Sequence, residues 1–392
     1  MSEVESKPSE VIDVNGQDST VPHTTTTTEK DTTKSSKDVH AHEDVKTSIK
    51  STALTTERAK TLSKLIDTLP QILCKLDNPD YDEIFGYRIN TSDKPHVNVN
   101  IRNEILLKFL AADNYDLQLS TQRLIKCFNW RNKFQPLHAA FKEEFDPELN
   151  SLGVITDFAE ANANLHVITW NLYGNLKNPK KIFEKFGDGG SHSHSHGNNV
   201  NDGDDDDDDD DVEFPGSQFL RWRVGLMEKS LQLVDFTSKD NNKIGQIHDY
   251  NNVSIFRIDR GMKQATKEII AIFGQNYPEL LSTKFFINVP LIMGWVFTFF
   301  KTIRVINEDT LKKFQVSNHG NLSEFLPKSE LPKSYGGSGS QESNGKKSSG
   351  DKGGDLFSLD VSNSIKLTEY GECVLKQKAN DHAIKHINDE VE

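Results

Sequence analysis

The sequence predicts an α/β fold in which an N-terminal helical region precedes a largely parallel β-sheet. Residues 51–147 carry apolar residues at helical spacing, and from residue 152 to residue 327 strand-like and helix-like segments alternate. Such alternation is typical of parallel strands joined by crossover helices. Strands are expected at 164–170, 231–236, 253–258 and 285–289, and helices at 217–229, 261–273 and 291–303.

The helical region is predicted from two amphipathic segments. Between Thr61 and Leu76 apolar residues recur at the spacing of one helix face, and Thr121 to Phe134 repeats the pattern. The apolar residues of the first segment are Leu62, Leu65, Ile66, Leu69, Ile72 and Leu73. We expect both segments to belong to a small helical cap.

The composition indicates that part of the chain lies outside a packed core. Only 35% of the 392 residues are hydrophobic, and the mean hydropathy is −0.61. Residues 1–50 are rich in Ser, Thr, Asp and Lys, with five consecutive threonines from Thr24 to Thr28. Such a segment cannot bury enough apolar surface to offset the entropy lost on folding, so we expect a disordered tail.

Cysteine usage favours a reducing compartment. Cys74, Cys127 and Cys373 are too widely spaced for a disulfide framework or a zinc pattern. The first residues also have no apolar segment typical of a signal peptide. We therefore expect a cytoplasmic protein.

A low-complexity insertion is expected at residues 187–213. It contains eight consecutive aspartates, Asp204 to Asp211, which supply eight charges of the net −13. It also contains the alternating histidines His192, His194 and His196. Histidines beside an acidic tract could chelate zinc, nickel or copper. The alternative is a solvated insertion without an evolved ligand, because no rigid scaffold is visible to fix a coordination geometry.

Residues 277–303 join a turn, a buried strand and an unusually apolar helix. Proline disfavours helical geometry in the residue before it, so Tyr277-Pro278-Glu279 should end the preceding helix. The helix expected after Pro290 has almost no polar face, so it must be buried, lie in a membrane or line an apolar cavity. Its apolar stretch is shorter than the roughly 20 residues that a membrane span needs. An ordinary core helix is the alternative to a cavity lining.

This segment carries a family resemblance. Residues 277–290 and the aromatic helix after them resemble the CRAL-TRIO lipid-binding domain of the Sec-fourteen-type phosphatidylinositol transfer proteins. Residues 105–116, 124–131 and 331–337 agree with the same family in the same order. The resemblance implies a helical N-terminal region at 51–147, a lipid-binding domain at 148–337, and a linker and tail at 338–392.

The resemblance also implies phosphatidylinositol as a ligand and a membrane surface as a peripheral partner. In this family the apolar helix gates an acyl-chain cavity, which assigns lipid contact to Trp295, Phe297 and Phe300. The chain departs from the family after its Leu-Leu-Lys-Phe-Leu segment, where Ala111 and Asp113 replace basic residues. Only Lys108 is retained there, so an exact copy of the family's headgroup site is not expected.

The headgroup of such a lipid needs cations for its phosphate and polar acceptors for its inositol hydroxyls. By the resemblance, Glu279 is the acidic residue of the turn, and Lys312 or Lys313 is its basic partner. A glutamate that merely caps a turn is an equally plausible role for Glu279.

A second constellation is a possible haem site. His248 and Tyr250 are two residues apart, so in an extended segment they point to one face, and both side chains can ligate haem iron. A satisfied polar pair is the alternative. Haem propionates would need cations, for which Arg223 and Lys284 are candidates, with Tyr173 on the cavity side.

The resemblance favours the haem interpretation. Residues 170–174, 221–229, 248–250 and 282–286 resemble a non-classical, haem-associated branch of the same family. This implies haem b as cofactor, with Tyr250 as axial ligand and His248 as neighbour or alternate ligand. A haem-binding redox or stress-sensing protein, with lipid exchange secondary, is the competing function.

Sequence motifs speak against an enzyme. The chain has no Gly-rich dinucleotide fingerprint, Walker loop, Gly-x-Ser-x-Gly elbow or His-Glu-x-x-His motif. We therefore expect no catalytic residues and no nucleic-acid partner. The expected location is the cytoplasm, with peripheral association to endoplasmic reticulum and microsomal membranes.

Overall fold

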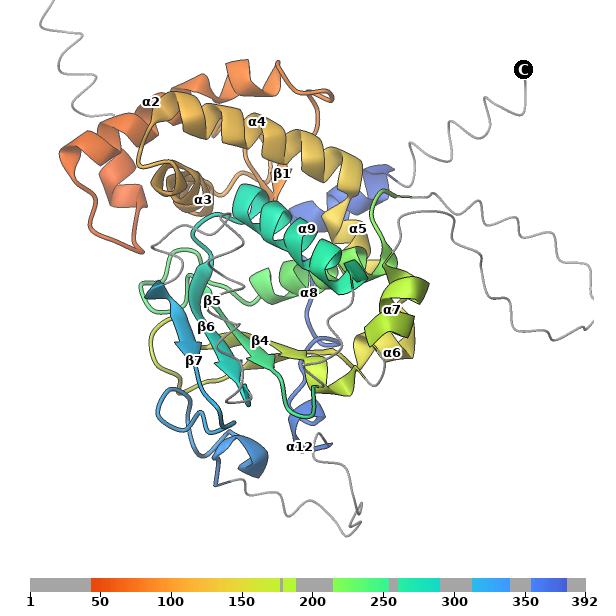
Figure 1. Ribbon diagram of the computed structural model, residues 1–392. Coiled ribbons are helices and arrows are strands. Elements are labelled where there is room, and N and C mark those ends of the chain that lie inside the picture. The colour runs from red at the N-terminus through yellow and green to blue at the C-terminus, as the bar shows by residue number, and fades with distance from the viewer. Residues whose placement is uncertain are drawn as a thin grey trace, which may run out of the picture. The chain divides into compact units, whose positions relative to one another are not determined.

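A computed structural model describes residues 44–176, 179–187, 214–253, 260–289, 312–338 and 354–378 (Figure 1). All of them belong to one compact unit that begins at His42. Packing starts ahead of residue 51, because residues 44–48 are helical and Ile49 is buried in the core. The boundaries expected at residues 147 and 337 stay predictions.

The N-terminal part is helical, as expected. Its helices are α2 (Thr56–Leu73), α3 (Val99–Ala112), α4 (Leu117–Phe134), α5 (Pro136–Phe141) and α6 (Pro147–Asn150), and β1 (Glu83–Ile84) pairs with β2 (Tyr87–Arg88). The side chains of Thr55, Asn98 and Asp116 each accept a hydrogen bond from a backbone N–H of the first turn of α2, α3 and α4. These caps satisfy N–H groups that the helix cannot pair, and so fix where each helix begins.

A five-stranded sheet forms the second part. Its strands lie in chain order: β3 (Gly153–Asp157), β4 (Val167–Leu172), β5 (Ile244–Asp249), β6 (Leu281–Ile287) and β7 (Phe314–Val316). The first pair is antiparallel and the other three pairs are parallel. The predicted α/β class with a largely parallel sheet is therefore confirmed.

Helices α8 (Gln218–Leu231) and α9 (Arg260–Asn276) lie between the sheet and the N-terminal helices, and α7 (Pro179–Phe186) lies to their side, in contact with both (Figure 1). Helix α8 begins at a Ser217 cap and is almost wholly buried, because it packs against α5, α9 and β4 at once. The helices expected at 217–229 and 261–273 correspond to α8 and α9. The structure also describes helix α12 (Gly354–Phe357), short 3-10 helices at Tyr173–Asn175 and Lys333–Tyr335, and a helical stretch at residues 369–378.

The two faces of the sheet differ in character. One face is apolar and is covered by residues 322–335 and by Leu356 of α12, which form a single core cluster. The sheet residues of that cluster include Ile168, Trp170, Leu172, Ile247, Phe285 and Ile287. On the opposite face, which is turned toward α8 and α9, polar residues alternate with these along the same strands. A polar face inside a protein is unusual and marks a place to look for a ligand.

One strand prediction was wrong, and another lies almost wholly outside the described residues. Residues 231–236 are not a strand, because α8 continues to Leu231 and the chain then turns, burying Val234 and Phe236 without a sheet partner. The central strand is β5, Ile244–Asp249, so it precedes the expected strand at 253–258; residues 254–259 lie outside the described part. The expected strand at 164–170 is β4, shifted along the chain, and that at 285–289 is the end of β6.

The C-terminal segment 354–378 ties the two parts of the fold together. The backbone N–H of Val361 donates to the carbonyl of Ile155 on β3 (2.9 Å), and the Ile155 N–H donates to Asp360 Oδ1 (3.0 Å). Farther on, the Tyr370 hydroxyl donates to Asp82, and Lys378 Nζ donates to Asn132 Oδ1 (2.9 Å). The tail is therefore part of the packed structure up to residue 378.

Candidate functional site

A cavity of about 470 Å³ lies between α9 and the strands β6 and β7. Its walls are mostly apolar, and its charged groups are few. The apolar lining includes Met227, Ile269, Phe273, Leu281 and Phe314, and the charged lining is Arg123, Glu279, Lys284 and Lys313. An apolar cavity with a few charged groups suits an amphiphilic ligand.

The polar face of the sheet meets this cavity at Gln246 and Lys284, which line it. Strand register places Gln246 beside Lys284 in one row, and Asn171, His248 and Phe286 in the next. Tyr250 follows β5 and still pairs with β6, since its N–H donates to the Ile287 carbonyl (3.1 Å). His248 and Tyr250 therefore share a face, as their spacing predicted.

Aromatic rings gather at the carboxyl end of this face. The ring of Tyr173 lies 5.4 Å from that of His248 and 5.4 Å from that of Tyr250, centroid to centroid. The His248 ring also lies 5.3 Å from Phe286. Gly174 allows this arrangement, because a β-carbon there would lie 1.8 Å from the carbonyl oxygen of Asn251.

Two cations face these rings from α8 and β6. The guanidinium of Arg223 lies 5.1 Å from the ring centre of Phe273, and Lys284 Nζ lies 5.7 Å from that of Phe286. Burial, reinforced by Arg223, lowers the pKa of Lys284 to about 7. Within the described residues neither cation has a carboxylate partner at salt-bridge distance.

The same surroundings fix the protonation of the two candidate iron ligands. Burial, together with Lys284 and Arg223, holds the pKa of His248 well below its ordinary value, so its imidazole is neutral at physiological pH. Burial, together with Tyr173, raises the pKa of Tyr250 well above its ordinary value. A neutral imidazole is the form that binds metals.

Several buried polar atoms on this face have no hydrogen-bond partner among the described residues. They are Thr169 Oγ1, Asn171 Oδ1, Arg223 Nη1 and His248 Nε2. Buried polar groups are ordinarily hydrogen-bonded, and each unpaired one costs about 1–3 kcal/mol. Three of these atoms belong to the sheet face and Arg223 belongs to α8, while three other unpaired atoms, on Gln232, Asn241 and Asn276, lie elsewhere; the grouping of four is consistent with a ligand site.

The predicted headgroup pair lies on the cavity wall at the start of the strands. Lys313 Nζ lies 3.5 Å from Glu279 Oε2, whereas Lys312 is exposed. Glu279 has a φ of 53°, in the left-handed region that non-glycine residues seldom adopt. Of the two lysines the sequence offered, Lys313 is thus the one beside Glu279.

The departure from the family pattern at Asp113 has a structural counterpart. Arg123 binds Asp113 through two hydrogen bonds of 2.7 and 2.8 Å, and its remaining donors reach the Gly274 carbonyl (2.9 Å). Although Arg123 lines the cavity, its guanidinium is largely committed to these groups. Lys284 and Lys313 are left as the cations best placed to meet an anionic ligand.

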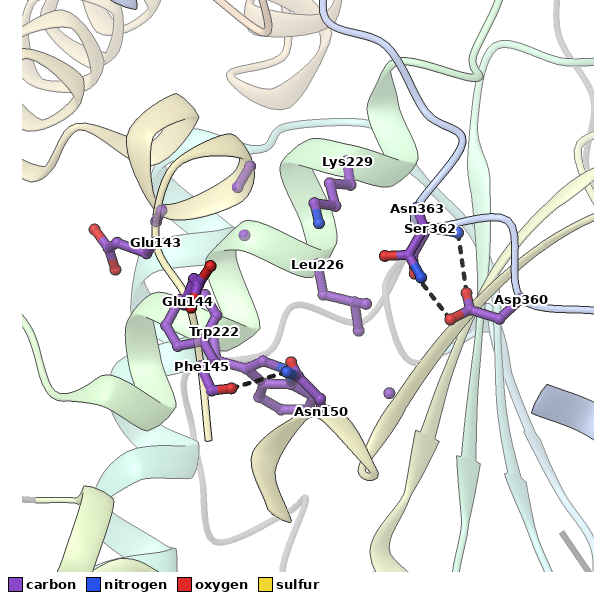
Figure 2. Close-up of a pocket in the computed structure, with 14 residues that line it drawn as sticks. Glu143, Glu144, Phe145, Asn150, Trp222, Leu226, Lys229, Asp360, Ser362 and Asn363 are labelled. Carbon is purple, nitrogen blue, oxygen red and sulfur yellow. Dashed lines mark hydrogen bonds between the residues drawn. The ribbon is translucent and has the colours of Figure 1, made fainter. Parts of the chain in front are cut away.

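A second cavity, of about 410 Å³, lies on another side of α8 (Figure 2). Lys229 projects into it, and Asp360 and Ser362 from the C-terminal segment form one wall. Two of its three acidic residues are already paired, since Asp360 accepts from Ser362 and Glu143 accepts from Arg221. We therefore place the candidate site in the first cavity.

Part of the predicted site lies outside the described residues. This applies to the gate helix 291–303 with Trp295, Phe297 and Phe300, and to the His/Asp insertion from residue 188 to residue 213. In the described part of the chain no helix is long and apolar enough to cross a membrane. The same part contains no cluster of three or more His, Cys, Asp or Glu side chains suited to a metal ion.

Sequence reasoning missed three polar residues of the site: Thr169, Asn171 and Gln246. Each alternates with a buried apolar residue, and Thr169, Asn171 and Tyr173 follow one another at the two-residue period of a strand. That period was the available signal. Polar residues at this period do not predict a buried parallel strand, because such a strand is expected to be apolar on both faces.

Comparisons with known proteins identify the family of the chain. Residues 196–337 match the model of the CRAL/TRIO domain family. The phosphatidylinositol transfer protein SFH5 of Lodderomyces elongisporus is 67% identical over 90% of this chain and 83% of its own length. The protein of the same name from Candida albicans is 65% identical over 89% of this chain and 98% of its own.

A solved structure shares the fold as well. The crystal structure of Sfh5 superposes with a TM-score of 0.67 at 33% identity, over 83% of this chain and 98% of the solved chain. The relatives' names describe lipid transfer proteins and no enzyme. Together with the parallel sheet, these similarities establish that the chain belongs to the Sec14-like family of CRAL/TRIO domain proteins.

Proposed function

We propose that the protein binds phosphatidylinositol in the cavity between α9 and β6–β7 and carries it between membranes. The observation that carries the proposal is the lining of this cavity, which is apolar along α9 and charged at Glu279 and Lys313. The names of the relatives support the same ligand. In this proposal the apolar helix 291–303 closes over the acyl chains, and membrane contact is peripheral, at endoplasmic reticulum and microsomal surfaces.

Transfer of labelled phospholipids between vesicles tests the proposal. The wild-type protein should move phosphatidylinositol well above a protein-free blank. A charge-assisted hydrogen bond contributes about 1.5–3 kcal/mol, so Lys313→Met should reduce phosphatidylinositol transfer roughly tenfold or more. Phosphatidylcholine has the same phosphate, so its transfer should also fall, but less, because it lacks the inositol that would contact Glu279 beside Lys313.

Lys312→Met is the matched control for that variant. It removes the same charge one residue away, from an exposed side chain, and should leave transfer of both lipids unchanged. Equal losses in the two variants would assign the effect to general membrane attraction instead of headgroup contact. A wild-type protein that transfers no phospholipid would exclude the proposed function.

A second candidate function, haem binding, is favoured by the unpaired atoms of the polar face. Arg223 and Lys284 would hold the propionates, and Tyr250 or His248 would ligate iron, with Tyr173 and Phe286 against the macrocycle. The donor set fits, because a buried arginine on α8 and a partly buried lysine on β6 face an imidazole and a phenol. When bound, haem would supply redox or sensing chemistry.

The chain itself prepares such a site in two ways. Burial keeps His248 neutral, so the lone pair of a ring nitrogen is available to a metal, and the rings of Tyr173 and Phe286 lie against it. The cost falls on Tyr250, whose phenol must lose its proton to act as a ligand. Titration of the protein with haemin, followed at the Soret band, tests this function; the absence of any saturable band would eliminate it.

A further inference from the structure

Lys108 of α3 is a buried cation that the lipid and haem assignments leave unused. Its side chain is almost fully enclosed, with 7% of the residue exposed. Its ammonium donates to the Asn242 carbonyl (2.9 Å), to Asn242 Oδ1 (3.2 Å) and to the Glu279 carbonyl (3.3 Å). No carboxylate among the described residues forms a salt bridge with it. The three donors of the ammonium are therefore spent on neutral oxygens.

The partners of Lys108 sit where two strands of the cavity begin. Asn242 precedes β5, and Glu279 belongs to the turn that leads into β6. The same turn is held at its other end by Tyr277, whose hydroxyl donates to Glu228 on α8 (2.5 Å). Two separate anchors thus fix a turn in which Glu279 has the left-handed φ of 53°.

Stability alone does not account for a lysine in this place. A buried ion without a counter-ion is costly, and apolar replacements of buried charges are often neutral or stabilising. Burial, with Lys243 adding to it, lowers the pKa of Lys108 to about 7, which reflects that cost. A gain elsewhere must offset it. Two of its hydrogen bonds anchor Asn242 at the start of β5, and the third ties the backbone of Glu279 to the same ammonium.

We propose that Lys108 is a positioning residue for headgroup selection, because it holds Glu279 in the conformation that presents the Glu279–Lys313 pair to the cavity. The inference rests on the proposed lipid-transfer function. It assigns a role to the one basic residue that the chain retains in its Leu-Leu-Lys-Phe-Leu segment. Lys108 acts from behind the cavity wall, which does not include it.

The test compares Lys108→Met with Lys243→Met in vesicle transfer of phosphatidylinositol and phosphatidylcholine. Lys108→Met should lower phosphatidylinositol transfer about tenfold and change phosphatidylcholine transfer less than about twofold. Lys243 is the matched control, since it also acts electrostatically on Glu279 and Lys313 but donates no hydrogen bond to the turn. Lys243→Met should therefore keep the wild-type preference.

The Glu279→Gln variant distinguishes a positioning role of Lys108 from a general role in stability, because selectivity is compared with and without the Glu279 carboxylate. If Lys108 acts through Glu279, the double variant should lose no more selectivity than Glu279→Gln alone. Thermal melting should show both single variants folded. If Lys108→Met fails to fold, Lys108→Arg decides, because it keeps the charge but cannot place three donors on the same oxygens.

The outcomes distinguish the inference from the function on which it rests. A Lys108→Met protein that is folded and keeps the wild-type preference refutes positioning while leaving lipid transfer intact. Equal losses in Lys108→Met and Lys243→Met assign the effect to charge and also refute it. A wild-type protein that transfers no phospholipid overturns both. Two results together support the proposal. Lys108→Met loses selectivity for phosphatidylinositol whereas Lys243→Met does not, and adding Lys108→Met to Glu279→Gln causes no further loss of selectivity.

Discussion

The Tyr250→Phe variant is expected to lose the Soret band that haemin should give with the wild-type protein. Phenylalanine keeps the ring packed against Tyr173 and Phe286 and removes only the oxygen proposed to ligate iron. The hydroxyl makes no hydrogen bond to any described residue, so the variant should melt within a few degrees of wild type. The substitution should therefore abolish the Soret band and lower the melting temperature only slightly.

Two neighbouring variants make that result specific. Tyr173→Phe removes a phenol from the same cluster and should leave the band in place, since Tyr173 is assigned to packing. His248→Ala should weaken or shift the band without abolishing it. An unaltered spectrum in Tyr250→Phe, together with loss of the band in His248→Ala, would transfer the ligand role to His248.

Arg131→Met is expected to have the largest effect on stability. Arg131 is fully buried between two fully buried carboxylates, with Nη2 2.8 Å from Glu83 Oε1 and Nη1 2.6 Å from Glu228 Oε1. Removing the cation leaves both carboxylates without a counter-ion, which costs about 3–5 kcal/mol when one partner of a buried pair is lost. Since whole domains are stable by about 5–15 kcal/mol, the urea midpoint should fall sharply.

Arg123→Met is the control, because its pair with Asp113 is partly exposed, at 20% and 10% of the two side chains. Such a pair contributes about 1 kcal/mol or less. Adding Glu83→Gln and Glu228→Gln to Arg131→Met should restore part of the lost stability, since it removes the stranded charges. If Arg131→Met unfolds no more easily than Arg123→Met, the buried network does not stabilise the fold as described.

The sequence was sufficient to predict elements whose burial is apolar and local. Helices α8 and α9 and strand β6 were foreseen from periodic or continuous apolar residues. Strand β5 was not, because Gly245, Gln246, His248 and Asp249 resemble a loop in composition. Those polar residues are buried because they face the cavity or pair inside the protein. A functional strand can therefore lack the apolar signature of a structural one.

The features that could not be predicted from the sequence are mostly contacts between residues far apart in the chain. Arg131 meets Glu83 and Glu228, which are 48 and 97 residues away in the chain. Lys108 meets Glu279 across 171 residues. Neither spacing has a local pattern, whereas the two-residue separation of His248 and Tyr250 does. The haem ligands could be proposed from the sequence, and the residues that hold the site in place could not.

The hydrogen bonds that Asp360 and Val361 make with Ile155 affect how the protein behaves at high concentration. Strand β3 is the last strand on its side of the sheet, and its outward backbone groups are a template for pairing with another chain. The C-terminal segment occupies that template at Ile155 with groups of its own. Removal of residues 354–378 would expose the backbone groups at Ile155, so the truncated protein is expected to aggregate at concentrations at which the full chain stays dispersed.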